Sequence, residues 1–535
     1  MAGVRQHSRN LFALCGSTFF FMSSYFTTVT LQSSFNTRRD FGLTSLAALY
    51  GFYSLSCFIS PVVITTLNTK WTIVFSSILY CIFIGVNIYP RFFTLIPVAA
   101  LVGLSAGPLW SAQASHLTTT ALNLALLTKE NASRVISRFN GIFYLFYVAC
   151  LIPGTLISSL ILHGGGAISL GAHKSTSSLN QCGANSCIYR QNTFVPSNLM
   201  NSTYNVTSYM IETPSVKTRL TLFAILAGWG LLGSIIALLL LDPLRSFCKV
   251  VPHPRDFYDH TMSIFKVMRK GKFLLLVPLI AFTSLEVGFT YATFTKFFVT
   301  CSIGVQNVGF TMSAYGVGGL LAAVLSGGLV RYTGRLPLLT AGFLCQVSLL
   351  VLMLMWVPHV GHEWQIYGMA VMSGVGGSIR LTQICAFLGV LFPRDQEAAF
   401  TAFNIFSGIA YSVYFALEII HQICVVYLIY TLLAWLVLAM ALYYSVEWKT
   451  RRVGFLSIND EVSYEEHWQE LDKRTKLLQQ PDDDDDDDDE KQCNNSATTC
   501  LNIKETSKSK SKLKCKDKKQ RPRSKLLVEE VETVV

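Results

Sequence analysis

The sequence predicts an all-α polytopic membrane protein whose twelve transmembrane helices form two six-helix bundles. Three observations carry this prediction. Hydrophobic residues make up 51% of the 535 residues and charged residues only 14%, against roughly 25% charged residues in soluble domains. The apolar residues fall in runs of about 20, the length of helix that crosses a bilayer. Runs six apart repeat each other weakly, as duplication of a bundle predicts.

Twelve apolar segments follow one another along the chain. They are 11–31, 43–66, 71–89, 93–115, 139–162, 219–241, 273–295, 307–330, 336–357, 365–390, 399–421 and 424–444. The first segment is long and has no small-residue cleavage site, so we interpret it as a spanning helix rather than a removed signal. The predicted N-terminal bundle is 1–241, and the predicted C-terminal bundle is 273–444.

A very short connection between the eighth and ninth segments fixes the predicted topology. It contains Gly327, Arg331, Gly334 and Arg335. The glycines permit a sharp turn, and the two arginines place charge at one interface, which the positive-inside bias assigns to the cytosol. Both termini and the basic linker 242–272 are then predicted to be cytosolic. The glycine and arginine pattern resembles the cytoplasmic loop signature of the major facilitator superfamily.

The largest predicted extracellular loop is 163–218. It contains acceptor sequons for N-glycosylation at Asn201 and Asn205, which must face the secretory lumen to be used. The same loop contains Cys182 and Cys187, two of the 14 cysteines in the chain. Because the extracellular environment is oxidising, we predict a disulfide between these two cysteines. Two free thiols, or the pairing of one of them with Cys301, are the alternatives.

Residues 445–535 are predicted to form a disordered cytosolic tail, because their composition cannot build an apolar core. The tail contains an unbroken acidic run from Asp482 to Asp489, followed by a lysine-rich stretch. Its last residues include Thr533 and Val535, which match the carboxyl-terminal pattern that a PDZ domain captures. A PDZ-domain protein is therefore a candidate partner. A solvated tail without a partner is the alternative.

Two ionisable residues lie deep inside predicted membrane segments. Glu286 is about 18 Å and Arg380 about 15 Å from the cytosolic ends of their segments, so their depths match. Each charge costs about 2.5–3.5 kcal/mol at a helix centre, and we predict that the two pair through a bidentate contact. Such a pair is either structural or part of a substrate or proton site. Gln113 and Gln383 occupy equivalent places in the fourth and tenth segments, where close helix packing is the alternative to a solute site.

No nucleotide-binding loop, nucleophile elbow or metal-ligand spacing occurs in the sequence, so we predict neither an enzyme nor a bound cofactor or metal. The formal net charge of +11 lies mainly in predicted cytosolic loops and tail. Topology explains this charge, and we predict no nucleic-acid partner. The predicted surroundings of the chain are the lipid bilayer.

Short motifs spread over both predicted bundles resemble one family. They include Gly107-Pro108-Leu109-Trp110, Gln181-Cys182-Gly183-Ala184, Phe294-Thr295-Lys296 and Tyr332-Thr333-Gly334-Arg335. Together they resemble the Unc-ninety-three family, in particular its A-type homologues, within the major facilitator superfamily. Arg380 departs from the uncharged residue expected in related sequences, so nothing is carried over from the family at the tenth segment.

The resemblance implies the major facilitator fold and a glycosylated plasma-membrane protein without enzymatic activity. It also implies that the chain regulates potassium channel activity through protein partners. Two other functions stay open on the sequence alone. One is secondary transport of an unidentified solute or ion, and the other is escort of membrane receptors during their trafficking.

Overall fold

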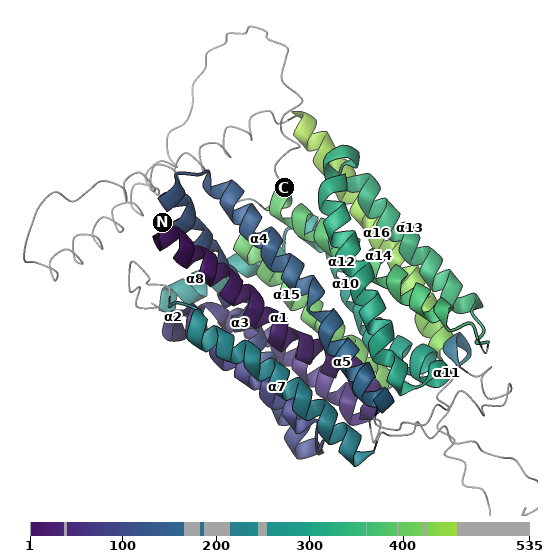
Figure 1. Ribbon diagram of the computed structural model, residues 1–535. Coiled ribbons are helices and arrows are strands. Elements are labelled where there is room, and N and C mark those ends of the chain that lie inside the picture. The colour runs from purple at the N-terminus through teal and green to yellow at the C-terminus, as the bar shows by residue number, and fades with distance from the viewer. Residues whose placement is uncertain are drawn as a thin grey trace, which may run out of the picture. The chain divides into compact units, whose positions relative to one another are not determined.

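The described residues of this computed structural model are 2–36, 40–164, 182–186, 215–243, 254–359, 361–392, 395–420 and 424–456. All regular secondary structure in them is helical (Figure 1). Met1–Arg452 form one unit by their contacts. The sequons at Asn201 and Asn205 and the terminal residues Thr533 and Val535 lie outside the described residues.

The helices follow in the order predicted from the apolar segments. They are α1 (Ala2–Phe35), α2 (Phe41–Val86), α3 (Phe92–Thr128), α4 (Ala132–Ala149), α5 (Leu151–Gly164), α7 (Val216–Leu240), α8 (Pro254–Met268), α9 (Gly271–Leu274), α10 (Val277–Phe289), α11 (Cys301–Ile303), α12 (Val308–Thr333), α13 (Arg335–Met355), α14 (Trp364–Leu391), α15 (Gln396–Ile420) and α16 (Val425–Leu456). Two short 3₁₀ turns, η3 (Gly183–Asn185) and η5 (Val305–Asn307), and a π-helical stretch, η4 (Thr290–Thr300), complete the described elements.

Eleven helical stretches among the described residues are long and apolar enough to cross a membrane, one fewer than predicted. The difference lies in α2, a 46-residue helix that contains the predicted segment 43–66 and most of the predicted segment 71–89. A straight helix of that length would measure about 69 Å, more than twice the hydrocarbon thickness of about 30 Å. Asn68, with φ 62° and ψ 157°, breaks the helical backbone. It divides α2 into two arms, 41–67 and 69–86.

The helices of the first and second halves of the sequence lie in two groups. In Figure 1 α1, α2, α3 and α7, coloured from purple to teal, lie together, and α12, α13, α14 and α16, coloured from green to yellow-green, lie together. The two groups meet along α2 with α15 and along α5 with α12. The division into bundles of six at 1–241 and 273–444 stays a prediction.

Small polar residues allow the close approach along α5 and α12. Thr155 and Ser313 share a hydrogen bond of 2.7 Å, and the Ser159 hydroxyl donates to the Gln306 carbonyl at 2.6 Å. A Cβ on Gly309 would overlap the Thr155 carbonyl oxygen. Because lipid chains are as apolar as leucine, such packing and hydrogen bonding stabilise helix pairs in a membrane.

Gly309→Ala should therefore separate α5 from α12 locally. We expect a loss of about 1 to 3 kcal/mol in stability, as for other overpacked sites, seen as a lower melting temperature of the purified protein. Gly327→Ala in the same helix is the control, because nothing lies within 4 Å of its added Cβ. Equal melting temperatures for the two variants would contradict the close contact.

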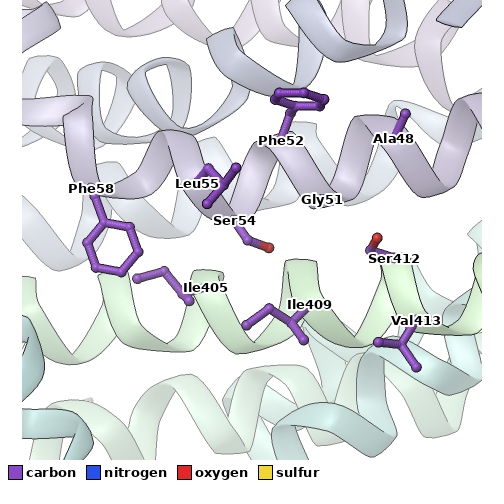
Figure 2. A pocket seen from close by; sticks show the side chains of 10 residues that line it. All are labelled: Ala48, Gly51, Phe52, Ser54, Leu55, Phe58, Ile405, Ile409, Ser412 and Val413. Atoms are coloured by element: carbon purple, nitrogen blue, oxygen red, sulfur yellow. The ribbon is translucent and has the colours of Figure 1, made fainter.

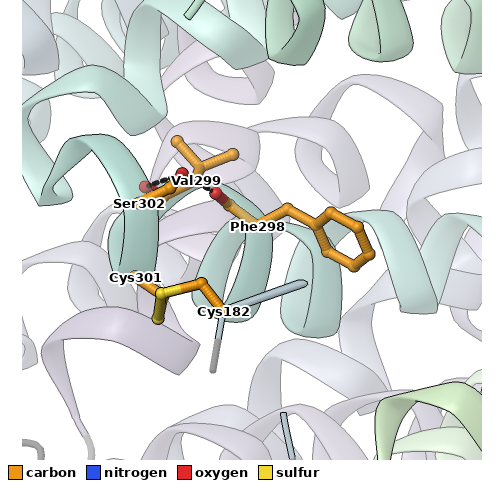
Figure 3. The surroundings of a disulfide bond; sticks show 5 residues. All are labelled: Cys182, Phe298, Val299, Cys301 and Ser302. Atoms are coloured by element: carbon orange, nitrogen blue, oxygen red, sulfur yellow. Dashed lines mark hydrogen bonds between the residues drawn. A yellow bond between two sulfur atoms is a disulfide. The ribbon is translucent and has the colours of Figure 1, made fainter. Parts of the chain in front are cut away.

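The predicted disulfide between Cys182 and Cys187 is wrong, because Cys182 is bonded to Cys301 (Figure 3). The two Cα atoms are 5.7 Å apart and the residues are 119 positions apart in sequence. Gly183 has φ +78° and lies against Trp356, at the end of α13, so η3 lies beside α13 and η4. Pairing with Cys301 was one of the alternatives. Cys187 lies outside the described residues.

Two boundaries differ from those predicted. The linker 242–272 contains the amphipathic helix α8, which buries Ile264 and Val267. Helix α16 continues to Leu456, beyond the predicted end of the last segment at 444, and buries Glu447. The predicted disordered tail from 457 onward lies outside the described residues.

Candidate functional site

A buried pair of opposite charges lies between α10 and α14. The Nη2 atom of Arg380 donates a hydrogen bond to Oε2 of Glu286 at 3.0 Å. Their side chains are 0% and 1% exposed. The structure therefore brings together the two deep ionisable residues that the sequence analysis placed at equal depth.

The contact is not the bidentate one that was predicted, because the second terminal nitrogen of the guanidinium binds a residue on a third helix. Arg380 Nη1 donates to Oε1 of Gln346, on α13, at 3.0 Å. The other carboxylate oxygen of Glu286 accepts from the hydroxyls of Ser373 at 2.8 Å and Thr290 at 3.5 Å. The pair thus joins α10, α13 and α14 through hydrogen bonds that spread its charge over neutral groups.

The local sequence of α14 makes room for these groups. Ser373, Gly377 and Arg380 recur at helical spacing and so share one face of the helix. A Cβ on Gly377 would lie 3.6 Å from the Glu286 Oε2 atom, and one on Gly376 would lie 3.1 Å from Arg380 Nη1. Glycine at both positions lets a guanidinium and a carboxylate lie beside the backbone.

A phenyl ring covers the remaining face of the guanidinium. The carbon centre of the Arg380 guanidinium lies 5.2 Å from the centroid of Phe282, close enough for a cation–π interaction. The Nε atom of Arg380 has no hydrogen-bond partner among the described residues. In a medium of low dielectric constant such a pair is stable only while both partners stay charged together or lose charge together.

Tyrosines fill the space next to the pair, and the sequence analysis did not identify them. Tyr50 of α2 stacks on Tyr411 of α15 with ring centroids 4.5 Å apart, and Tyr25 donates to the Tyr50 hydroxyl at 3.5 Å. Tyr291 packs edge-on against Tyr315 with centroids 6.2 Å apart. In the sequence, these tyrosines could have been identified by their positions on the inward faces of the predicted helices.

The two glutamines predicted at equivalent places do not join this cluster. Gln113 donates through Nε2 to the Thr18 hydroxyl at 2.9 Å, within the first half. Gln383 is buried on α14. The Oε1 atom of each glutamine has no hydrogen-bond partner in the described chain, so both amides keep unused hydrogen-bonding capacity.

Arg335 of the predicted cytoplasmic loop motif has a partner that the sequence analysis missed. Its Nη2 atom donates to both carboxylate oxygens of Glu447 at 3.0 Å each, and its guanidinium lies 4.2 Å from the Phe387 ring centroid. Gly334, with φ 76°, ends α12, and Gly327 lies within that helix. Arg331 also belongs to α12, but its side chain is not among those described. The motif arginine thus ties the start of α13 to α16.

Two further ionisable residues, the partly exposed Glu418 and the buried His116, received no role from the sequence. Glu418 accepts a hydrogen bond from Thr293 at 3.2 Å, and Thr293 also contacts the Tyr414 hydroxyl at 2.5 Å. His116 is fully buried and contacts the Thr69 hydroxyl through Nδ1 at 3.2 Å. Within the described ranges, no group of three or more His, Cys, Asp or Glu residues is placed to hold a metal ion.

The chain is similar to proteins of one described family. Residues 33–362 match the family described as "Ion channel regulatory protein UNC-93". A relative named "Protein unc-93 homolog A" from Bos taurus is 31% identical over 451 residues, which cover 83% of this chain and 94% of that protein. The "Putative potassium channel regulatory protein unc-93" of Caenorhabditis elegans is 27% identical, over 80% of this chain and 59% of that protein.

One solved structure shows the fold. The nucleoside transporter NupG, crystallised as a D323A mutant, superposes with a TM-score of 0.55 over 83% of this chain and 99% of that one. Its sequence is only 11% identical, so the similarity concerns the fold alone. The predicted facilitator-type helical fold is thereby confirmed.

Proposed function

This chain belongs to the UNC-93 family of ion channel regulatory proteins, and from that premise we propose that it regulates potassium channel activity by binding a channel within the membrane. The name of the Caenorhabditis elegans relative supports the choice of a potassium channel. The observation that carries the proposal is the enclosure of Glu286 and Arg380. Protein groups from three helices bind both charges, which supports a structural role for the pair over a solute site.

The proposal includes a location and a topology. We propose that the chain lies in the plasma membrane with both termini in the cytosol. The arginines at the end of α12 and the start of α13 support the proposed orientation. The membrane-facing helices would then supply the surface that meets the channel, and a PDZ-domain protein at Thr533 and Val535 would be a second partner.

Secondary transport is the second candidate, and specific atoms favour it. The Nε atom of Arg380 and the Oε1 atoms of Gln113 and Gln383 are buried and have no hydrogen-bond partner in the described chain. Unused donors and acceptors of this kind would recognise a polar solute if the two halves separated. Transport and regulation predict different electrical and uptake behaviour.

Co-expression with candidate potassium channels should change potassium current by at least about twofold at constant channel abundance on the cell surface. The reason is that a regulator acts by shifting a channel between states, which needs a coupling of only about 1 kcal/mol or less. Whole-cell current and surface biotinylation of the channel measure the two quantities separately. Cells that express the chain alone serve as the control for uptake of labelled solutes.

Each outcome of this experiment bears on one candidate. A changed current with no uptake in the control cells supports regulation. Uptake by the chain alone, abolished by Arg380→Met while the variant still reaches the surface, would favour transport and contradict the proposal. A current change that follows channel surface abundance would instead indicate escort of the channel.

A further inference from the structure

An apolar groove runs along the outside of the seam between α2 and α15. It has a volume of about 400 Å³ and includes Phe52, Leu55, Phe58, Ile405, Ile409 and Val413 in its lining. In Figure 2 the side chains of Leu55 and Phe58 on α2 face those of Ile405 and Ile409 on α15. Four of these residues, including Leu55 and Ile409, expose large apolar side chains at the surface. In a membrane protein such a surface is in contact with lipid.

The polar groups of the groove are already occupied. Ser54 donates to the Tyr50 carbonyl at 3.1 Å, and Ser412 donates to the Ala47 carbonyl at 2.8 Å. The lining contains no charged side chain. The groove can therefore bind a flexible apolar chain, but its lining has no free polar side chain or charge to bind a polar solute.

The groove is much shorter than a membrane span. Along α2 it extends from Ala48 to Phe58, about 15 Å by helix rise, which is half of the hydrocarbon thickness of about 30 Å. A transmembrane helix of a partner would need contact along its whole span, whereas an acyl chain occupies a single leaflet. A groove that covers only part of a membrane span therefore favours an acyl chain over a partner helix.

Helix α8 closes one end of the groove and carries basic residues. Phe265 of α8 stacks on Phe58 with ring centroids 5.8 Å apart. The exposed residues Tyr258, Met262, Phe265 and Arg269 recur at helical spacing, with Arg269 just past the end of α8. They therefore share one face, on which Phe265 contacts the groove.

The basic residues at this end leave positive charge for a ligand. Lys266, Arg269 and Lys272 are exposed and pair with no carboxylate of the described chain. Lys270 is different, because Asp395 neutralises it at 2.6 Å. Basic residues on an amphipathic helix at the cytoplasmic end of membrane helices are typical of sites for anionic lipid headgroups.

We propose that this groove binds one anionic phospholipid of the inner leaflet. Its acyl chain lies between α2 and α15, and its phosphate contacts Lys266 and Arg269 at the end of α8. Because the lipid touches both halves at their seam, its presence stabilises the contact of α2 with α15. The site is independent of whether the chain regulates a channel.

Native mass spectrometry of the full-length protein in detergent tests the site with two probes, 1-palmitoyl-2-oleoyl phosphatidylserine and the corresponding phosphatidylcholine. We expect the first bound lipid to be phosphatidylserine by preference. Lys266→Gln with Arg269→Gln should weaken phosphatidylserine binding about thirtyfold, the factor for two surface charges, and should weaken phosphatidylcholine binding less, because the choline cation offsets the charge of its phosphate. Leu55→Trp should fill the groove and weaken binding of both lipids.

Two controls match these variants. Lys129→Gln with Arg134→Gln removes the same two charges from another exposed region on the predicted cytosolic side. Leu321→Trp adds the same ring at a site that is 56% exposed, against 60% for Leu55. The proposal is overturned if the wild type binds both lipids equally, if the charge control weakens phosphatidylserine as much, or if Leu55→Trp binds lipid like Leu321→Trp.

Discussion

Arg380→Met should destabilise the protein by about 3 to 5 kcal/mol, because it leaves the carboxylate of Glu286 buried without a partner. The wild-type pair is fully enclosed, and Arg380 also holds Gln346. Methionine keeps much of the volume of the arginine stem but supplies no charge. The measurement is the melting temperature of the purified protein, together with the amount of protein that reaches the cell surface.

Two comparisons separate the pair from a general effect of substitution. Glu286→Gln combined with Arg380→Met should recover most of the lost stability, since two neutral groups of similar size need no counter-charge. Arg9→Met breaks the ion pair with Asp242 at the protein surface, of 2.6 Å, and should cost at most about 1 kcal/mol. If the double variant is no more stable than Arg380→Met alone, the account of the pair fails.

Cys301→Ser should lower the stability by about 3 to 5 kcal/mol and release a free thiol at Cys182. The bond joins cysteines that are 119 positions apart in sequence, and the loss of so long a closure gives the unfolded chain a large gain in conformational entropy. Thermal unfolding measures the stability. Peptide mapping under non-reducing conditions should recover a fragment that joins Cys182 to Cys301.

The control for this prediction is Cys385→Ser, since Cys385 is a free cysteine on α14. We expect that substitution to change the melting temperature by little. The double variant Cys182→Ser with Cys301→Ser should lose no more stability than either single variant, because one bond is lost in each. Recovery of a peptide that joins Cys182 to Cys187 in the wild type would show that the loop closes locally.

The sequence was sufficient to predict the helices because their length is set by the bilayer. It was also sufficient to predict which ionisable residues meet, since charges at a helix centre are rare and Glu286 and Arg380 lie at equal depth. It could not predict that Gln346 accepts a hydrogen bond from the second nitrogen of Arg380. The hydropathy of α13 does not determine how that helix is rotated about its axis.

Other features escaped sequence reasoning for related reasons. Glu447 lies beyond the apolar part of the last segment, so a length criterion ends the helix before the residue that binds Arg335. Cysteine pairing depends on where loops fold back in space, and spacing alone favoured the neighbour Cys187 over Cys301. The break at Asn68 lies in the short polar stretch between two predicted membrane segments, where a loop is expected. Only one residue of this stretch leaves the helical conformation.

That single-residue break has a mechanical consequence. The arm 41–67 of α2 meets α15 through Ser412 and Ala47, and the arm 69–86 meets α7 through Cys81 and Ser234. Because only Asn68 separates the two arms, the position of one arm restricts the position of the other, and α2 forms a short covalent connection between α7 and α15.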